Sequence, residues 1–334
     1  MSNTRVHRQH GFTLVEVMVS ITVGLILLSG VLSIFISNKA AYRLQESTNV
    51  LDENARFALN QIQYHLRMGD HWGGVEADNI DVDAPLAALP IANTCTESKV
   101  ISTTGFYGIE GAATSPLSCI PNADYKPNTD ILIVRYAGPE RVISASVQST
   151  DVYLRAKIGA AGRLFKGNAL TSLPSDIYEL PDPDYEANYQ FMTVIYFIRK
   201  CASQDRGTPN LCDAADDTTP TLARLVLRGT ALVQEDVVAG VEQLQARYGK
   251  LTDGNPPTTQ YYDATTLTTN KEWPLVVNVQ VSLVLRSTEF DVTHADERSF
   301  DLYGGYTFAP ANADKHFSRK QYNFAVQIRN MTRG

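Results

Sequence analysis

Hydrophobic positions in the first seventy residues divide into two stretches. From Val17 to Asn38 the chain is uncharged and mostly apolar. Residues 39–69 are mixed, and their apolar positions recur at spacings of 7, 4, 3 and 4, as along one stripe of an amphipathic helix: Leu44, Leu51, Ala55, Ala58 and Ile62. This pattern predicts that the stripe is buried against a sheet or another subunit.

Both stretches are expected to belong to one helix. Residues 12–66 contain neither proline nor a turn cluster. Arg67-Met68-Gly69 has the form of a helix end, with a cation in the last turn and a glycine beyond it. A helix of about 55 residues is roughly 80 Å long, whereas the hydrocarbon layer of a bilayer is roughly 30 Å thick. We therefore expect the N-terminal part to span a membrane and the rest to emerge.

Beyond residue 130 the period changes to that of β-strands. Val277–Leu283 alternates in polarity, which indicates an antiparallel strand with one solvated face. Residues 70–129 are interpreted as a long connecting region, and residues 171–189, 203–220 and 249–272 as surface loops rich in Pro, Asp, Asn and Thr. The predicted strands are 131–136, 151–154, 192–198, 222–227, 241–248, 276–285 and 322–328.

These elements predict an α+β fold, a long N-terminal helix packed on an antiparallel β-sheet with long loops. One globular domain is the default, and two sheet lobes are the alternative. With 334 residues and 44% hydrophobic content, the chain can bury a full core beside its anchor. The formal charge of −7 argues against general nucleic-acid binding, which needs clustered Lys and Arg.

A short basic segment precedes the apolar run. It contains Arg5 and Arg8, ends in Gly11, and is followed by Phe12-Thr13-Leu14-Val15-Glu16. An ordinary secretory signal places its cleavage site after the apolar stretch. Here the cut would fall before that stretch, so the mature protein would keep its anchor.

These residues resemble the class III leader of type IV pilins and type II secretion pseudopilins. In those proteins a dedicated peptidase cuts after the glycine and methylates the new N-terminal phenylalanine. Three further stretches are similar to the PilW family of long minor pilins: Tyr42–Glu46, Asp52–Leu59 and Arg67–Gly74. Residues 240–245 and 327–330 resemble the same family more weakly. The family often has a cysteine after the Trp-Gly pair, where this chain has Gly74.

The resemblance implies a pilin-like fold and a division of the chain into four parts. Residues 1–11 would be a leader removed by prepilin peptidase, and 12–38 a transmembrane and polymerisation helix. Residues 39–69 would be an amphipathic periplasmic helix and 70–334 a periplasmic β-rich globular domain. The protein would cross the bacterial inner membrane once and later enter a pilus. Its expected partners are the peptidase, the inner-membrane assembly machinery, the major pilin and other minor pilins.

Glu16 is the candidate for subunit pairing. A carboxylate at the edge of an apolar membrane stretch costs a few kcal/mol when it has no partner. The resemblance implies that Glu16 pairs with the Phe12 amine of a neighbouring subunit. The alternative is that Glu16 only marks the water interface. Nearby, Ser20 and Gly24 have the spacing of small residues that let helices approach closely, although such residues are also common in membrane helices.

Four cysteines lie beyond the membrane segment: Cys95, Cys119, Cys201 and Cys212. An even count in an exported chain favours disulfides, as in an oxidising periplasm, and allows three connectivities. We predict sequential pairing, because a turn-rich stretch with Gly207, Pro209 and Asn210 separates the last two cysteines. A zinc site is the alternative, but no CxxC or His-rich spacing accompanies the thiols.

Catalytic motifs are absent from the sequence, which has no HExxH, GxSxG or dinucleotide fingerprint. Residues 162–167 have the two glycines of a phosphate loop, but Asn168 and Ala169 stand where Lys and Ser/Thr are required. His65, His71, His294 and His316 are interpreted as surface or packing residues. Two acidic clusters, Asp213/Asp216/Asp217 and Asp182/Asp184, could chelate calcium, but they lack EF-hand spacing and are interpreted as solvated loop charge.

The sequence therefore favours a non-enzymatic structural subunit with no catalytic residue, metal or cofactor. The leading hypothesis is a minor pilin that primes pilus assembly or forms the pilus tip. A pseudopilin at the periplasmic tip of a type II secretion system is the alternative. A membrane-tethered periplasmic enzyme or receptor is a third hypothesis, motivated by the large loop-rich ectodomain.

Overall fold

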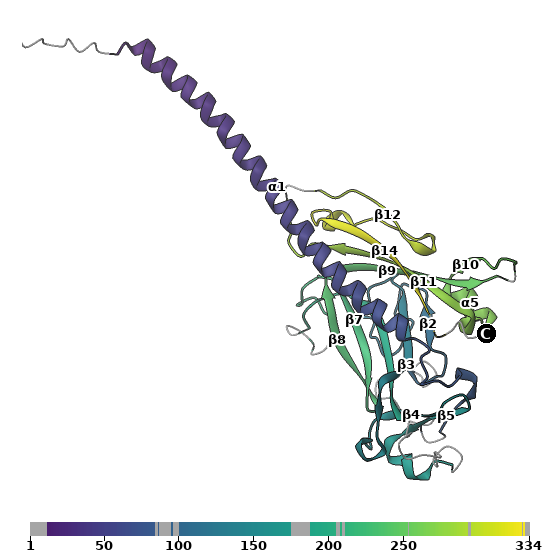
Figure 1. Cartoon of the computed structure of the whole chain (residues 1–334). Coiled ribbons are helices and arrows are strands. Elements are labelled where there is room, and N and C mark those ends of the chain that lie inside the picture. The colour runs from purple at the N-terminus through teal and green to yellow at the C-terminus, as the bar shows by residue number, and fades with distance from the viewer. Residues whose placement is uncertain are drawn as a thin grey trace, which may run out of the picture. The chain divides into compact units, whose positions relative to one another are not determined.

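The structure is a computed structural model that describes residues 12–83, 86, 95, 100–174, 188–204, 208, 211–252, 254–292, 295–328 and 330. The chain divides into two compact units, Met1–Asn49 and Val50–Gly334. Helix α1, Leu14–Met68, has 55 residues and contributes to both units (Figure 1). The predicted continuous helix is confirmed.

The C-terminal end of α1 is closed by the residues that directly follow it and by Asn330. The Gly69 amide donates to the His65 carbonyl oxygen over 2.9 Å, and Asp70 has a left-handed φ of 63°. The Asn330 side chain donates to the carbonyl oxygens of Arg67 and Gly69 over 3.2 and 3.0 Å. Helix carbonyls that have no partner within the helix are thereby satisfied.

The larger sheet has eight strands, six of which lie in the order β1-β5-β4-β6-β3-β2. Strand β7 also pairs with β6, and β8 pairs with β7. Strand β1 pairs with β5 in parallel, and the other pairs are antiparallel. The strands are β1 Ile80–Val82, β2 Phe106–Ile109, β3 Ile131–Val142, β4 Val152–Lys157, β5 Ala161–Lys166, β6 Asn188–Arg199, β7 Thr221–Arg228 and β8 Ala231–Ala239.

A second sheet has the antiparallel order β10-β9-β11-β14, and β12 pairs with β13 in a small ladder. These strands are β9 Val241–Leu251, β10 Thr259–Tyr262, β11 Val276–Arg286, β12 Phe300–Asp301, β13 Thr307–Phe308 and β14 Arg319–Gln327. The short helices are α5 Ala264–Asn270, η1 Ala77–Asn79, η2 Ser144–Ser146, η3 Gly167–Ser172, η5 Trp273–Leu275, η6 Tyr303–Gly305 and η7 Asn312–Asp314.

The main core lies where the C-terminal part of α1 meets both sheets. Leu51, Ala55, Ala58 and Ile62 are each at most 3% exposed and pack with apolar residues of β3, β6, β9 and β11. The predicted stripe is therefore covered by sheet from Leu51 onward. Leu44, which belongs to the other unit, remains 50% exposed.

The expected long connecting region over 70–129 also contains β1 and β2, and it supplies side chains to a second core on the opposite face of the eight-stranded sheet. Trp72 is buried and stacks on Phe191 with ring centroids 6.1 Å apart. A Cβ on Gly73, which has a φ of 59°, would lie 2.5 Å from the Tyr189 ring, so only glycine fits there. The Arg67–Gly74 motif thus ends the helix and inserts Trp72 into this core.

The prediction of a surface loop over residues 249–272 is wrong, because this stretch contains β10 and α5. The Asp263 carboxylate caps α5 by accepting from the Thr266 amide over 2.6 Å. Ala264 and Leu267 are buried and anchor the helix. Residues 162–167, which had the glycines of a phosphate loop, lie in β5 and at the start of η3.

The expectation that one face of β11 is solvated is only partly met. Val279, Val281 and Leu283 face the main core, as the alternation predicts. On the opposite face, Val284 packs with Phe300 and Leu302. The segment that contains these two residues covers part of the second face.

The structure pairs Cys95 with Cys119 and Cys201 with Cys212, with Cα–Cα distances of 4.8 and 5.7 Å. Gly207, Pro209 and Asn210 lie outside the described residues. Non-reducing peptide mapping of exported protein is expected to return these two disulfide-linked peptide pairs. Free thiols or crossed pairs would contradict this connectivity.

Candidate assembly site on the N-terminal helix

Thr13 lies just before helix α1 and caps its first turn. Gly11 lies outside the described residues, whereas Phe12 is described and 82% exposed. The Thr13 hydroxyl accepts from the Glu16 amide over 3.3 Å. Thr13 and Glu16 have the spacing of a capping box, a signal for the helix start that the sequence analysis missed.

The carboxylate of Glu16 is exposed, and no hydrogen bond or ion pair reaches it from the residues that the structure describes. Its position in the first turn of α1 is electrostatically favourable, because a helix N-terminus carries partial positive charge. That interaction places the acid at the helix start but leaves most of its charge uncompensated. The chain therefore provides a carboxylate that is available to a group on another molecule.

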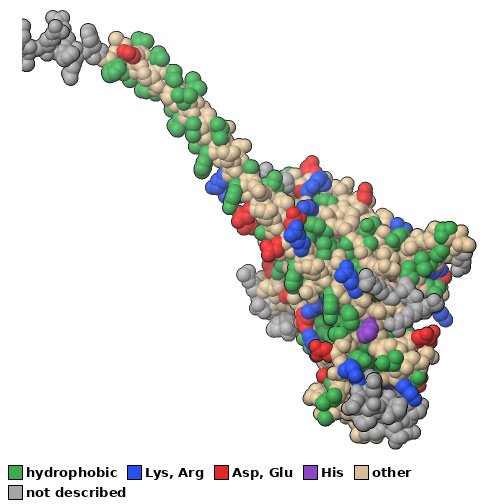
Figure 2. Space-filling view, in the orientation of Figure 1, with side chains coloured by type: hydrophobic (Ala, Val, Ile, Leu, Met, Phe, Trp, Pro, Cys, Tyr) green, Lys and Arg blue, Asp and Glu red, His purple; other side chains and the backbone are tan. Residues whose placement is uncertain are grey.

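The rest of the anchor segment exposes large apolar side chains, which are seen along the face shown in Figure 2. Helix α1 contains an 18-residue window of mean hydropathy 2.5, none of which is buried within the molecule. By length and composition it can cross a membrane. Its large exposed side chains include Met18, Leu25, Ile26, Leu28, Val31 and Phe35.

Small residues of this segment are not required by the chain's own packing. A Cβ added to Gly24 or Gly30 would meet nothing within 4 Å. The Ser20 hydroxyl donates to the Glu16 carbonyl oxygen over 2.7 Å, so its polar group is satisfied within the helix. Any packing reason for the glycines must come from a surface outside this chain.

The emergent part of α1 is tied to the second sheet through Asp52. Its Oδ1 accepts from Lys320 Nζ and from the Tyr322 hydroxyl, each over 2.6 Å. The hydrogen bond from Lys320, followed by that from Tyr322, lowers the pKa of Asp52. Asp52 therefore stays ionised and helps to hold the helix on β14.

His65 is a packing histidine, as expected. It is buried, with Nδ1 3.5 Å from the Tyr136 hydroxyl and Nε2 3.4 Å from Arg224 Nη1. Burial, and then the nearby Arg224 charge, lower the pKa of His65 to about 4. The ring is therefore neutral near pH 7.

Acid is expected to destabilise the domain through His65. Between its ordinary pKa of 6.5 and the folded value of about 4, only the unfolded chain binds the proton, so the free energy of unfolding falls as the pH drops. The loss reaches at most roughly 3 kcal/mol. Urea unfolding, followed by tryptophan fluorescence above and below this interval, should show a weaker pH dependence for His65→Gln. Equal pH slopes for the two proteins would contradict the assignment.

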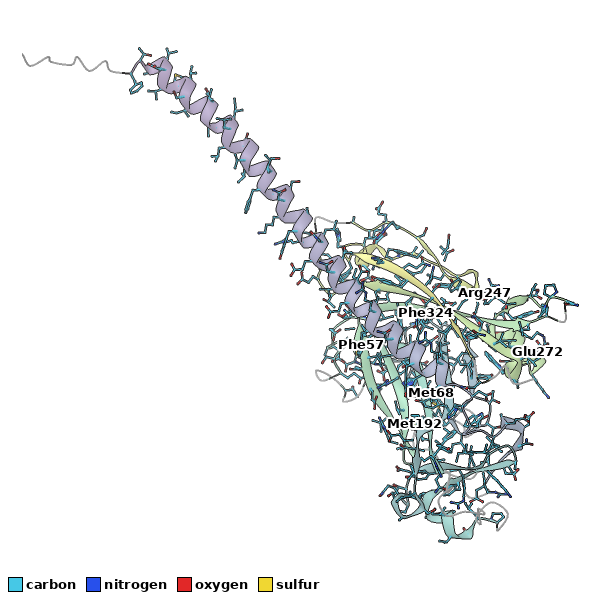
Figure 3. All side chains as sticks on the ribbon, viewed as in Figure 1. Phe57, Met68, Met192, Arg247, Glu272 and Phe324 are labelled. Atoms are coloured by element: carbon cyan, nitrogen blue, oxygen red, sulfur yellow. A yellow bond between two sulfur atoms is a disulfide. The ribbon has the colours of Figure 1, made fainter. Side chains whose placement is uncertain are left out.

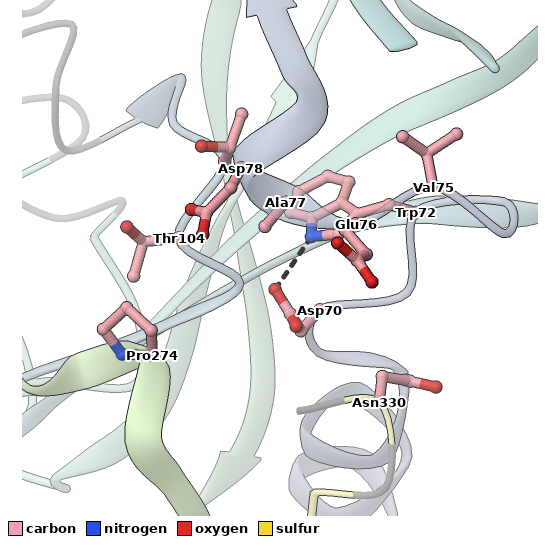
Figure 4. A pocket seen from close by; sticks show the side chains of 10 residues that line it. Asp70, Trp72, Val75, Glu76, Ala77, Asp78, Thr104, Pro274 and Asn330 are labelled. Atoms are coloured by element: carbon pink, nitrogen blue, oxygen red, sulfur yellow. Dashed lines mark hydrogen bonds between the residues drawn. The ribbon is translucent and has the colours of Figure 1, made fainter. Parts of the chain in front are cut away.

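A small cavity lies beside the end of α1 (Figure 4). Its volume is about 180 Å³, smaller than typical ligand pockets of roughly 300 Å³ or more. Asp70 in its wall accepts from Trp72 Nε1 over 2.8 Å. Among the described residues, no group of three His, Cys, Asp or Glu side chains could hold a metal ion.

In the acidic cluster after Cys212, Asp213 is exposed, as expected of solvated loop charge, whereas Asp216 is buried and Asp217 orders the loop. The Asp217 carboxylate accepts from the amides of Ala202 and Ser203 over 3.0 and 2.7 Å. Asp216 accepts from the Asp213 amide over 3.0 Å. Asp182 and Asp184 lie outside the described residues.

A long N-terminal helix with an exposed apolar part, whose later turns pack on antiparallel sheets, defines a pilin-like α+β protein. Residues 195–330 match the family model described as Type IV Pilus-assembly protein W, and residues 6–32 match the model described as Prokaryotic N-terminal methylation motif. These matches confirm the resemblance to the PilW family and to chains with a class III leader.

The family match falls elsewhere than the sequence motifs suggested. Residues 195–330 include the echoes at 240–245 and 327–330 but exclude residues 42–74. Among solved structures, a type IV-like pilin from Thermus thermophilus is similar, with 10% identity and a TM-score of 0.34 over 85% of this chain and 97% of that chain. No curated protein matches this chain in sequence.

Proposed function

We propose that this chain is a minor pilin, a non-enzymatic structural subunit of type IV pilus assembly. The observation that carries the proposal is the exposed apolar start of α1 with the free Glu16 carboxylate. A membrane can hold the apolar surface, and the Phe12 amine of a neighbouring subunit would supply the cation that Glu16 lacks. The two family matches support the same role.

In this proposal the leader is removed after Gly11, and the mature chain starts at Phe12. Residues 12–38 hold the protein in the inner membrane and later polymerise, while residues 70–334 face the periplasm. Other minor pilins and the major pilin are the partners, and the site of action is the priming or tip complex. The ectodomain of some 265 residues supports a terminal position, because a large domain fits poorly inside a fibre shaft.

Processing is the first test of this function. Mass spectrometry of the membrane-extracted protein is expected to show loss of residues 1–11 and a methylated Phe12. Gly11→Leu should abolish cleavage, because the family peptidase requires the residue before the cut to lack a side chain. The subunit should then be missing from sheared pili.

Gln9→Leu is the matched control, because it adds the same side chain to the leader away from the cut. It should be processed and incorporated normally. A Gly11→Leu chain that is cleaved after residue 11 would overturn the assignment, as would wild-type protein that keeps its leader.

A further inference from the structure

The face of α1 that turns away from the core carries an apolar row at a fixed spacing. Val50, Phe57 and Tyr64 follow one another every seven residues and are 48, 50 and 51% exposed. All three lie in the unit Val50–Gly334, where the opposite stripe of the same helix is fully buried. The helix therefore has a second apolar seam that its own sheets leave uncovered.

A groove lies beside this seam, between α1 and the eight-stranded sheet. It has a volume of about 370 Å³, with Tyr64 and His65 on the helix side and Met192 and Val226 on the sheet side. Figure 3 shows Phe57 on α1 and Met192 on the sheet near the C-terminal end of that helix. Tyr64 belongs to both the seam and the groove, so the two adjoin, and we call them together the trough.

The sheet side of the groove carries more positive than negative charge. Arg224 and Arg228 line it, and both pair with Glu235, at 2.7 and 3.0 Å. One carboxylate thus faces two guanidinium groups, in a protein whose formal charge is −7. Arg228, whose side chain is 52% exposed, is positioned to accept a second carboxylate from a partner.

We propose that this trough receives an amphipathic α-helix of a different pilin-class subunit, with an apolar seam for Phe57 and Tyr64 and a carboxylate for Arg228. The inference rests on the proposed function. A helix is the occupant because a seven-residue repeat gives a straight seam that another helix can follow at a shallow angle. The contact lies on the emergent part of α1 and adds a surface beside the sheet to the contacts of the anchor segment.

Photo-crosslinking in cells tests the occupant. A benzophenone amino acid at Phe57 or Tyr64 is expected to form adducts whose cross-linked peptide comes from a helix of another pilin-class subunit. The same probe at Ile158, which is 71% exposed on the β4–β5 turn, is the control and should not form them. Adducts to a second copy of this chain, to a β-rich surface or to lipid would overturn the proposal, as would no adducts at all.

A charge reversal tests the groove separately from the proposed function. Arg228→Glu should be processed and reach the membrane like wild type. Its amount in sheared pili should be reduced by about tenfold or more. Arg228→Lys should restore incorporation. If wild type enters pili and Arg228→Glu enters equally, the groove inference fails alone. If wild type never enters pili, the proposed function fails.

Discussion

Glu16→Val is expected to abolish incorporation of this subunit into pili while leaving processing and membrane insertion intact. Removing a charge makes the segment more apolar, so residence in lipid is not impaired. The Phe12 amine of the neighbour would instead remain unpaired in a medium of low dielectric constant. Deleting one partner of a buried pair costs roughly 3 to 5 kcal/mol, a loss of about a hundredfold or more in association. The measurement is the amount of subunit in sheared pili at equal membrane abundance.

Two further variants separate pairing from helix capping. Glu16→Gln keeps a side chain that can complete the capping box with Thr13 but removes the charge, so pairing predicts that it fails like Glu16→Val. Glu46→Val removes an exposed carboxylate from the emergent helix and should have no effect. Normal incorporation of Glu16→Gln would mean that the residue acts as an interfacial or capping group, and the pairing mechanism would have to be withdrawn.

Glu242→Gln is expected to lower the free energy of unfolding by roughly 3 to 5 kcal/mol, because it leaves the buried Arg319 without its counter-charge. Glu242 is 2% exposed and accepts from Arg319 Nε and Nη2 over 2.6 and 3.3 Å. Arg286 Nη1 lies 3.8 Å from the same carboxylate, and its side chain is 3% exposed. The pair joins the start of β9 to β14, so its loss should loosen the second sheet.

The measurement is the urea midpoint of the full mature chain in detergent, followed by fluorescence of Trp72 and Trp273. Glu235→Gln is the control, because Glu235 also serves two arginines but is 28% exposed, where an ion pair contributes at most about 1 kcal/mol. Equal midpoint shifts for the two variants would show that the buried Glu242 pair stabilises the protein no more than the exposed Glu235 pair.

The helix and the long strands were predictable because each repeats a simple period over many residues. The stripe from Leu51 to Ile62 and the alternation of Val279, Val281 and Leu283 each describe one buried face. Strand β2 has only four residues, and β8 carries Glu235 and Asp236, whose charges are compensated by arginines of other strands. Such elements depend on partners distant in sequence, which periodicity cannot reveal.

Of the candidate assembly site, Glu16 could be predicted from the sequence, whereas the exposed apolar row on α1 could not. Glu16 stands out in any chain, since a lone acid beside a long apolar run is chemically conspicuous. The exposed row of Val50, Phe57 and Tyr64 was not recognised, because a second seam on a helix is visible only after the first has been assigned to the core. The role of Asn330 was equally hidden, since it caps a helix more than 260 residues earlier in the chain.

That cap has a consequence for the order of events during biogenesis. Strand β14 and Asn330 are the last described parts of the chain, yet they complete the covering of α1 and close its end. Helix α1 is made early and therefore cannot reach its final surroundings until residues 319–330 have been made and lie in the same compartment. A chain that is interrupted before residue 319 retains its anchor but leaves one edge of its sheet open. The covering of α1 is thus complete only once the chain has been made through Asn330.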